Sequence, residues 1–132
     1  MIGLDTNVLV RFIAQDDAVQ SRAATRLIER RPTVENPGHV NVVAMAQTAW
    51  VLQRVYGLSD KSLAATIERI LQVDVLEVEN QQQVFAAMLA VRTGRGAFAD
   101  ALIGALDANA GCSRTLTLDR KASRLPGFEL LS

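Results

Sequence analysis

The chain begins with MIGLDTN (residues 1–7), a short uncharged run that ends in the carboxylate of Asp5. An aspartate in this position has two interpretations. It can cap a following helix, because Asp, Ser, Thr and Asn accept hydrogen bonds from the free N–H groups of a first helical turn. It can also bind a metal at the carboxyl end of a strand, where open α/β sheets hold their chemistry. These residues alone leave both interpretations open.

The same pattern occurs again in TLTLD (115–119), where an uncharged strand ends in Asp119. Further short strands are predicted at 39–43, 75–79 and 128–131. Segments with helical character lie between them, at 18–31, 42–57, 59–71, 81–94 and 98–111. Short strands that alternate with helices are typical of βαβ units. We therefore predict an α/β fold, a three-layer sandwich with a four- or five-stranded, mostly parallel central sheet.

The composition is that of an ordinary globular chain. Its 132 residues are 49% hydrophobic and 21% charged, which suits one domain (1–132) with its own core and excludes a disordered chain. No apolar run reaches the roughly 18 residues of a membrane span, and we expect no signal peptide. A single cysteine suits a reducing cytoplasm. The net charge of zero disfavours a protein that coats nucleic acid by charge alone.

A third carboxylate lies on the predicted helix 98–111. Asp100, Gly104 and Asp107 form a stripe separate from the apolar face, and Gly104 leaves space beside Asp100. An aspartate in a first turn also stabilises a helix without any metal. Carboxylates that crowd together repel unless a cation joins them, and oxygen ligands select Mg²⁺ or Mn²⁺. Such a cluster suits phosphodiester hydrolysis, whereas motifs for zinc, P-loop or Ser and Cys nucleophile chemistry are absent.

Four ordered blocks of the chain resemble the PIN domain family, and in particular the VapC-type toxins of bacterial toxin–antitoxin pairs. The blocks are MIGLDTNVLVRFIAQDD (1–17), QTAWVLQRVYGLS (47–59), FADALIGALDANAGC (98–112) and TLTLDRKASRLPGFELL (115–131). By this resemblance, the family's catalytic and metal-binding carboxylates match Asp5, Asp100 and Asp119. Polar residues near the family's site match Thr6, Asn7 and Thr117.

The resemblance also implies an activity and partners. It implies Mg²⁺- or Mn²⁺-dependent endoribonuclease activity on structured RNA such as tRNA or rRNA. It further implies a homodimer and a VapB-type antitoxin that blocks the active site. Cations that follow or precede Asp119 are candidates to hold the RNA backbone, with a solvated surface as the alternative: Arg114, Arg120, Lys121 and Arg124.

The sequence departs from the family where a fourth acid is usual. Similar proteins have Glu three residues before the Trp of the second block, and this chain has Gln47. The amide oxygen of Gln47 can ligate a cation but brings no charge, so we expect metal binding to be at least ~10-fold weaker. A smaller departure is Ala97, where many relatives carry Asp. Gln47 is compatible with a weakened toxin, with an introduced substitution, or with a site that no longer cuts.

Three hypotheses follow for the function. The first is a metal-dependent ribonuclease toxin, and the second is a PIN-like module that binds RNA or a protein without cutting. The third, a phosphoacceptor signalling domain, is disfavoured because the first strand ends in one acid rather than an adjacent pair. Aromatic side chains at helical positions, Trp50 among them, are predicted to lie in the core or in a dimer interface.

Overall fold

Three short parallel strands form the first sheet of the computed structural model, which describes residues 1–131. β1 (Ile2–Gly3) pairs with β2 (Gly38–Val40), and β2 pairs with β3 (Leu76–Val78). A second, separate pair of parallel strands consists of β4 (Thr115–Thr117) and β5 (Phe128–Leu130). The predicted α/β class and parallel pairing are confirmed, with the described strands divided between two sheets. Ser132, the last residue of the predicted domain, lies outside the described residues.

Helices follow each strand of the first sheet. They are α1 (Thr6–Ala14), α2 (Ala18–Arg30), α3 (Val42–Arg54), α4 (Asp60–Leu71), α5 (Gln81–Arg92) and α6 (Phe98–Asn109), with a short 3₁₀ turn η1 (Ala122–Arg124) near the end. The starts of α1 to α4 are fixed by side chains that accept hydrogen bonds from first-turn N–H groups, namely Asp5, Asp17, Asn41 and Ser59. Local capping chemistry therefore sets these boundaries.

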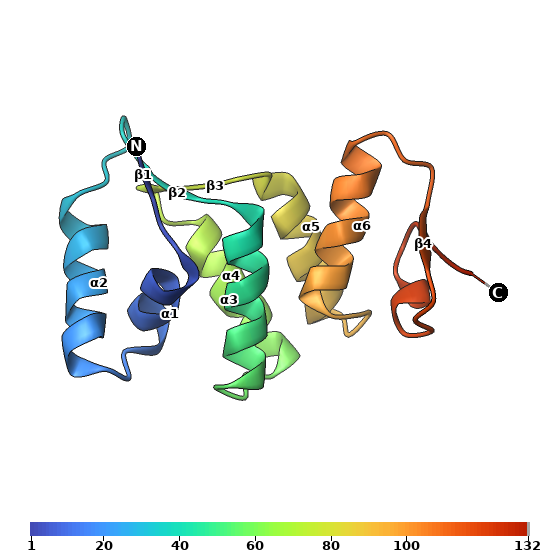
Figure 1. The fold of residues 1–132 in the computed structure, drawn as a ribbon, viewed down its shortest axis with the longest axis horizontal. Helices are drawn as coiled ribbons and strands as arrows, with labels where there is room; N and C mark the ends of the chain where they lie inside the picture. Colours follow the sequence, from blue (N-terminus) through green and yellow to red (C-terminus); the bar gives the residue numbers. More distant parts are fainter. Residues whose placement is uncertain (132) are drawn as a thin grey trace.

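The core runs through the middle of the molecule, between the first sheet and the helices. In Figure 1 the chain passes from α1 and α2 at one end, through α3 and α4, to α5, α6 and β4 at the other. The side chains that are almost completely buried come from β2, from α1 and from α3 to α6, and include Val40, Leu9, Met45, Leu63, Met88 and Phe98. Within residues 1–131, none of these helices has the length and apolarity needed to cross a membrane.

The β4–β5 pair lies against α6. Phe128 of β5 packs so closely on Gly104 of α6 that a Cβ at position 104 would collide with the ring. The expectation that Gly104 leaves space beside Asp100 was therefore wrong, because Phe128 occupies the space beside Gly104. On the same helix, Asp107 Oδ2 accepts a hydrogen bond from the Thr115 hydroxyl at 2.7 Å. These contacts hold β4 and β5 on α6 rather than beside β1, whose two residues offer few hydrogen bonds for pairing.

Candidate functional site

Polar side chains follow all three strands of the first sheet at their carboxyl ends. Asp5 lies just after β1, Asn41 after β2 and Glu79 after β3. Because parallel strands end at the same edge of a sheet, these groups gather at one edge. Asp5 caps α1, while Asn41 and Glu79 both accept hydrogen bonds from N–H groups in the first turn of α3. Asn41 and Glu79 were predicted to lie inside strands, and their position directly after buried strand residues could have identified them.

Gln47 lies beside Asp5 at this edge. The Thr6 hydroxyl, one residue after Asp5, donates a hydrogen bond of 2.7 Å to Gln47 Oε1. Asp5, Thr6 and Gln47 are shared by two adjoining hollows in the surface. One of these hollows is completed by Asn7, Trp50 and Val51. The structure therefore brings together four residues that the sequence singled out, on α1 and α3, and adds Trp50 to them.

The other two predicted carboxylates line neither hollow. Asp100 is half-buried in the first turn of α6, a helix that packs against α3. Asp119 is exposed after β4, and its Oδ1 accepts hydrogen bonds from the backbone N–H of Lys121 at 2.8 Å. Asp5 thus makes the capping contact that was the alternative to metal binding, whereas Asp119 closes a turn before η1, whose start has no side-chain cap.

The arrangement of carboxylates bears on the implied metal. In the described part of the chain, no three Asp, Glu, His or Cys side chains form a group that could hold a metal ion. Asp5 and Asp119 follow strands of different sheets, so the carboxylates as arranged here do not fit a shared ion. We derive no chemical step through a metal, and the metal-binding role of Asp5, Asp100 and Asp119 stays a prediction.

Comparison with protein families shows which family this chain belongs to. The model of the PIN domain family matches residues 2–127, which is nearly the whole sequence. The chain belongs to the PIN domain family. PIN domains are typically metal-dependent nucleases, so this membership indicates a nuclease, and thus a hydrolase, in general terms. Comparison with curated proteins gives no match.

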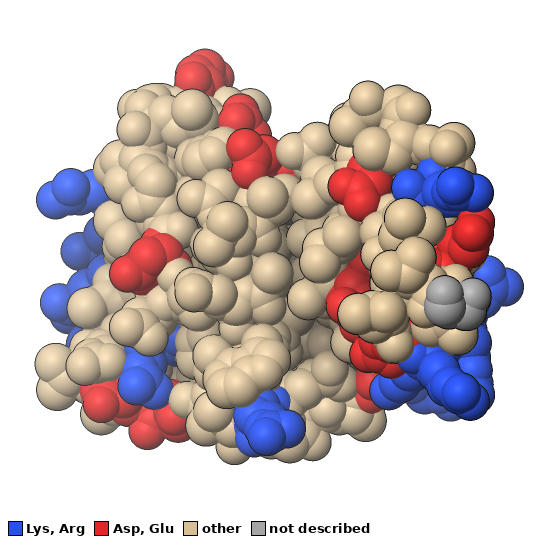
Figure 2. Space-filling model, turned by 45° about the vertical axis from the view of Figure 1, so that its right-hand side comes forward, with Lys and Arg blue, Asp and Glu red and all other residues tan. Residues whose placement is uncertain are grey.

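The predicted RNA-backbone cations of this PIN domain lie near its C-terminal strands. Arg114 forms an ion pair of 3.0 Å with Glu129 across the β4–β5 pair. The side chains of Arg120, Lys121 and Arg124 are exposed, and basic side chains gather on the right-hand side of the view in Figure 2. The Thr117 hydroxyl accepts a hydrogen bond from the Asp119 N–H. These residues therefore lie near Asp119, and not at the sheet edge where Asp5 lies.

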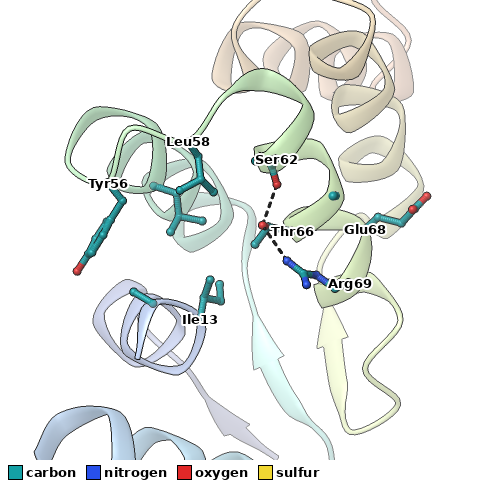
Figure 3. Close-up of a pocket in the computed structure, with 10 residues that line it drawn as sticks. Ile13, Tyr56, Leu58, Ser62, Thr66, Glu68 and Arg69 are labelled. Carbon is teal, nitrogen blue, oxygen red and sulfur yellow. Dashed lines mark hydrogen bonds between the residues drawn. The ribbon is translucent and has the colours of Figure 1, made fainter. Parts of the chain in front are cut away.

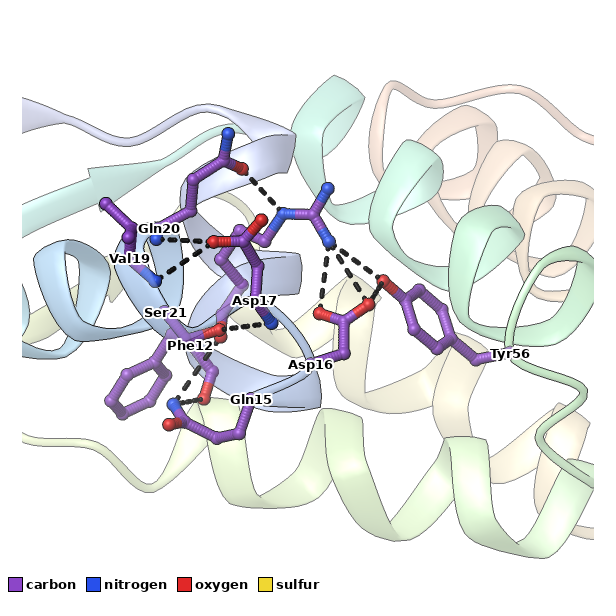
Figure 4. Close-up of polar contacts among 9 residues, drawn as sticks. Phe12, Gln15, Asp16, Asp17, Val19, Gln20, Ser21 and Tyr56 are labelled. Carbon is purple, nitrogen blue, oxygen red and sulfur yellow. Dashed lines mark hydrogen bonds and ion pairs between the residues drawn. The ribbon is translucent and has the colours of Figure 1, made fainter.

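A polar network joins the end of α1 to the end of α3 in this PIN domain (Figure 4). The Tyr56 hydroxyl donates to Asp16 Oδ2 at 2.6 Å, and Arg11 Nη1 lies 3.0 Å from Asp16 Oδ1. Arg11 Nε also donates to Gln20 Oε1. The hydrogen bond from Tyr56 lowers the pKa of Asp16, and the same bond raises the pKa of Tyr56. The network fixes α1, which carries Asn7 and begins directly after Asp5.

A further hollow lies between α1, α3 and α4, away from the strand ends (Figure 3). Ile13, Leu58 and Tyr56 form part of its wall. On its α4 side the Thr66 hydroxyl donates to the Ser62 carbonyl at 2.8 Å and accepts from Arg69 at 3.4 Å. Because these polar groups are satisfied within the wall itself, we place the candidate site of the PIN domain at the strand-end edge instead.

Proposed function

We propose that this PIN domain is a VapC-like endoribonuclease that hydrolyses phosphodiester bonds in structured RNA of the tRNA or rRNA class. The observation that carries the proposal is the meeting of Asp5 and Gln47 at one sheet edge of a PIN domain. Gln47 stands at the position where, by resemblance, the relatives have a catalytic Glu. The pairing of a strand-end Asp with this position is what the VapC-like hypothesis requires.

The side chains at this edge suit binding of an RNA backbone. The Asn7 and Gln47 amides carry N–H donors, which bind phosphate or ribose oxygens. Gln47 uses its oxygen, not its nitrogen, in the bond from Thr6, so the donors of Gln47 remain for a ligand. The Asp5 carboxylate accepts one N–H through Oδ1 in capping α1. Its second oxygen can accept a proton or a hydrogen bond from the substrate.

We propose Mg²⁺ or Mn²⁺ as the cofactor, because PIN nucleases usually use divalent metals. The resemblance names Asp5, Asp100 and Asp119 as its ligands. The separate position of the β4–β5 pair speaks against all three acting on one ion in this arrangement. Held at such a site, a divalent ion would supply Lewis-acid chemistry toward a water and a phosphate.

We further propose two protein partners from the same resemblance, a second copy of the chain and a VapB-type antitoxin. A VapC-like protein purified alone should have the mass of a homodimer in light scattering. A VapB-type antitoxin should form a stable complex with it and suppress its RNA cleavage. A monomer that binds no such antitoxin would remove the toxin role and leave the nuclease proposal to be judged on cleavage alone.

The test of the nuclease proposal compares the protein with its Gln47→Glu variant. Both are incubated with total cellular RNA in Mg²⁺, in Mn²⁺ and in EDTA, and the products are resolved by electrophoresis. We expect Gln47→Glu to cut a discrete RNA only with metal, and the Gln47 form to cut at least ~10-fold more slowly, since the added carboxylate attracts a divalent ion.

The control variant is Asp5→Asn in the Gln47→Glu background, which should lose the restored activity. If neither form cuts any RNA over a wide range of metal concentration, the protein is no ribonuclease. The result would then favour the second candidate function, a PIN-like module that binds RNA or protein without cutting. Two observations already favour that candidate, namely the uncharged Gln47 and the capping contact of Asp5.

A further inference from the structure

Trp50 lies on the surface beside the candidate site. Its side chain is 61% exposed, so of the two predicted places the core is wrong, and the dimer interface stays a prediction. The buried residues of α3 lie on one face of the helix, and Trp50 lies on the other. This exposure is unusual, because tryptophan is highly buried on average. Trp50 shares its hollow with Asp5, Asn7 and Gln47. The ring therefore stands at the border of the polar site and not in an isolated apolar patch.

Trp50 is the centre of a stripe of exposed side chains along α3. Gln47, Trp50 and Arg54 follow one another at spacings of three and four residues, which is the spacing of one helical face. In the part of the chain that the structure describes, Arg54 has no ion-pair partner. The stripe offers an amide, an aromatic face and a free guanidinium, one turn apart.

We propose that Trp50 is a stacking platform for an unpaired nucleobase of RNA. Aromatic faces stack on splayed bases in single-stranded RNA, and guanidinium groups bind phosphate. The Gln47 amide would contact the nucleotide next to the stacked base, and Arg54 a phosphate on the other side. This inference rests on the proposed function, since it takes RNA as the ligand. It adds that the RNA must be unpaired at the site, as in a loop or a bulge.

The surroundings of Trp50 favour a nucleotide over a second copy of this chain. Trp and Arg are enriched at the centre of a protein–protein interface, but Asp and Glu are depleted there. The hollow beside Trp50 instead contains the Asp5 carboxylate and the amides of Asn7 and Gln47, and the Arg54 cation lies one turn further along α3. Amides, a cation and an aromatic ring are the groups with which proteins recognise single-stranded RNA.

Fluorescence provides a direct test, because Trp50 is the single tryptophan of the chain. The protein is titrated in EDTA with a short unstructured RNA, with the same sequence as a duplex, and with a strand that carries abasic positions. We expect the unpaired strand to quench the emission, and the duplex and abasic strands to quench it far less. In fluorescence anisotropy with labelled RNA, Trp50→Ala should weaken binding about tenfold, and Trp50→Phe less, since its smaller ring still stacks.

Phe85→Ala is the matched control, because Phe85 is also an exposed aromatic residue but lies on α5. This variant should bind RNA as the parent does. If RNA binds without quenching and Trp50→Ala leaves the affinity unchanged, the platform is refuted while the ribonuclease proposal stands. If Trp50→Ala instead breaks a dimer in light scattering at unchanged RNA affinity, Trp50 belongs to an interface between copies. If no form binds RNA at all, the proposed function itself fails.

Discussion

At the scale of single residues, Tyr56 and Asp16 form a hydrogen bond that can be observed in solution. The Tyr56 hydroxyl donates to Asp16, and this bond raises the pKa of Tyr56 above its ordinary value of 10.0. Since Tyr56 is the single tyrosine of the chain, a titration of tyrosinate absorbance should give one transition above pH 10. Asp16→Asn should return this transition toward 10, as should unfolding in denaturant. A transition at or below 10 in the folded parent would contradict the network.

The same hydrogen bond gives the direction of a pH effect on stability. The pKa of Tyr56 is raised on folding. Its contribution to the free energy of unfolding is therefore complete below the pKa of the unfolded state, and it is lost as the pH rises through the pKa of the folded state. The pKa of Asp16 is lowered on folding. Its contribution to the free energy of unfolding is therefore present above the pKa of the unfolded state, and it is lost as the pH falls through the pKa of the folded state. The network therefore stabilises the packing of α1 against α3 most strongly at pH values between the pKa of Asp16 and the pKa of Tyr56.

At the scale of elements, α6 begins without a side-chain cap. Its N-cap residue, Ala97, has extended backbone angles, but no side chain accepts from the first turn. Ala97→Asp, the residue that the resemblance expects, should supply this acceptor and raise the free energy of unfolding by about 0.5–2 kcal/mol. Urea denaturation followed by circular dichroism measures the change.

Ala99→Asp is the matched control for this cap. Residue 99 is exposed in the first turn of α6, so the variant adds the same charge near the helix N-terminus without occupying the cap position. Its free energy of unfolding should rise only by the smaller contribution of the helix dipole, about 0.3–1 kcal/mol. Equal stabilisation by the two variants would mean that charge alone, and not the capping hydrogen bond, acts at the start of α6.

The elements of this fold could be predicted because their boundaries are set locally. Ser59 caps α4, and Gly57 and Gly94 lie in the left-handed region just after α3 and α5, as their residue types indicate. The pairing of strands is set by contacts between distant residues. Phe128 packs on Gly104, and β1 and β4, the strands before Asp5 and Asp119, belong to different sheets. Neither feature leaves a periodic pattern in the sequence.

Part of the candidate site was predictable for the same reason. Asp5 follows the first strand, and Gln47 lies one helical turn before Trp50. The order of the four family-like blocks was therefore enough to identify both residues as candidates. The exposure of Trp50 could not be predicted, because helical periodicity gives the face of a residue but not the elements that cover it. The positions of Asp100 and Asp119 depend on how the C-terminal third of the chain packs against the rest of the molecule.

At the scale of the whole molecule, the separation of the two sheets makes a prediction about proximity. With Cys112 replaced by Ser, cysteines are introduced at Ile2 in β1 and Leu116 in β4. A disulfide forms only when two Cα atoms lie within about 7 Å. Because β1 and β4 belong to different sheets, mild oxidation should leave this pair uncrosslinked, as seen in non-reducing electrophoresis.

The matched control is a cysteine pair at Leu116 and Glu129, which are register partners in the β4–β5 pair and should crosslink readily. The decisive comparison adds Mn²⁺ before oxidation. If Ile2 and Leu116 crosslink without metal, the five strands form one sheet, and Asp5 and Asp119 share an edge after all. If they crosslink only with Mn²⁺, a metal gathers the carboxylates by moving the C-terminal strands. If they crosslink in neither condition, Asp5 and Gln47 act without Asp119, and any catalysis depends on the groups at the edge of the first sheet.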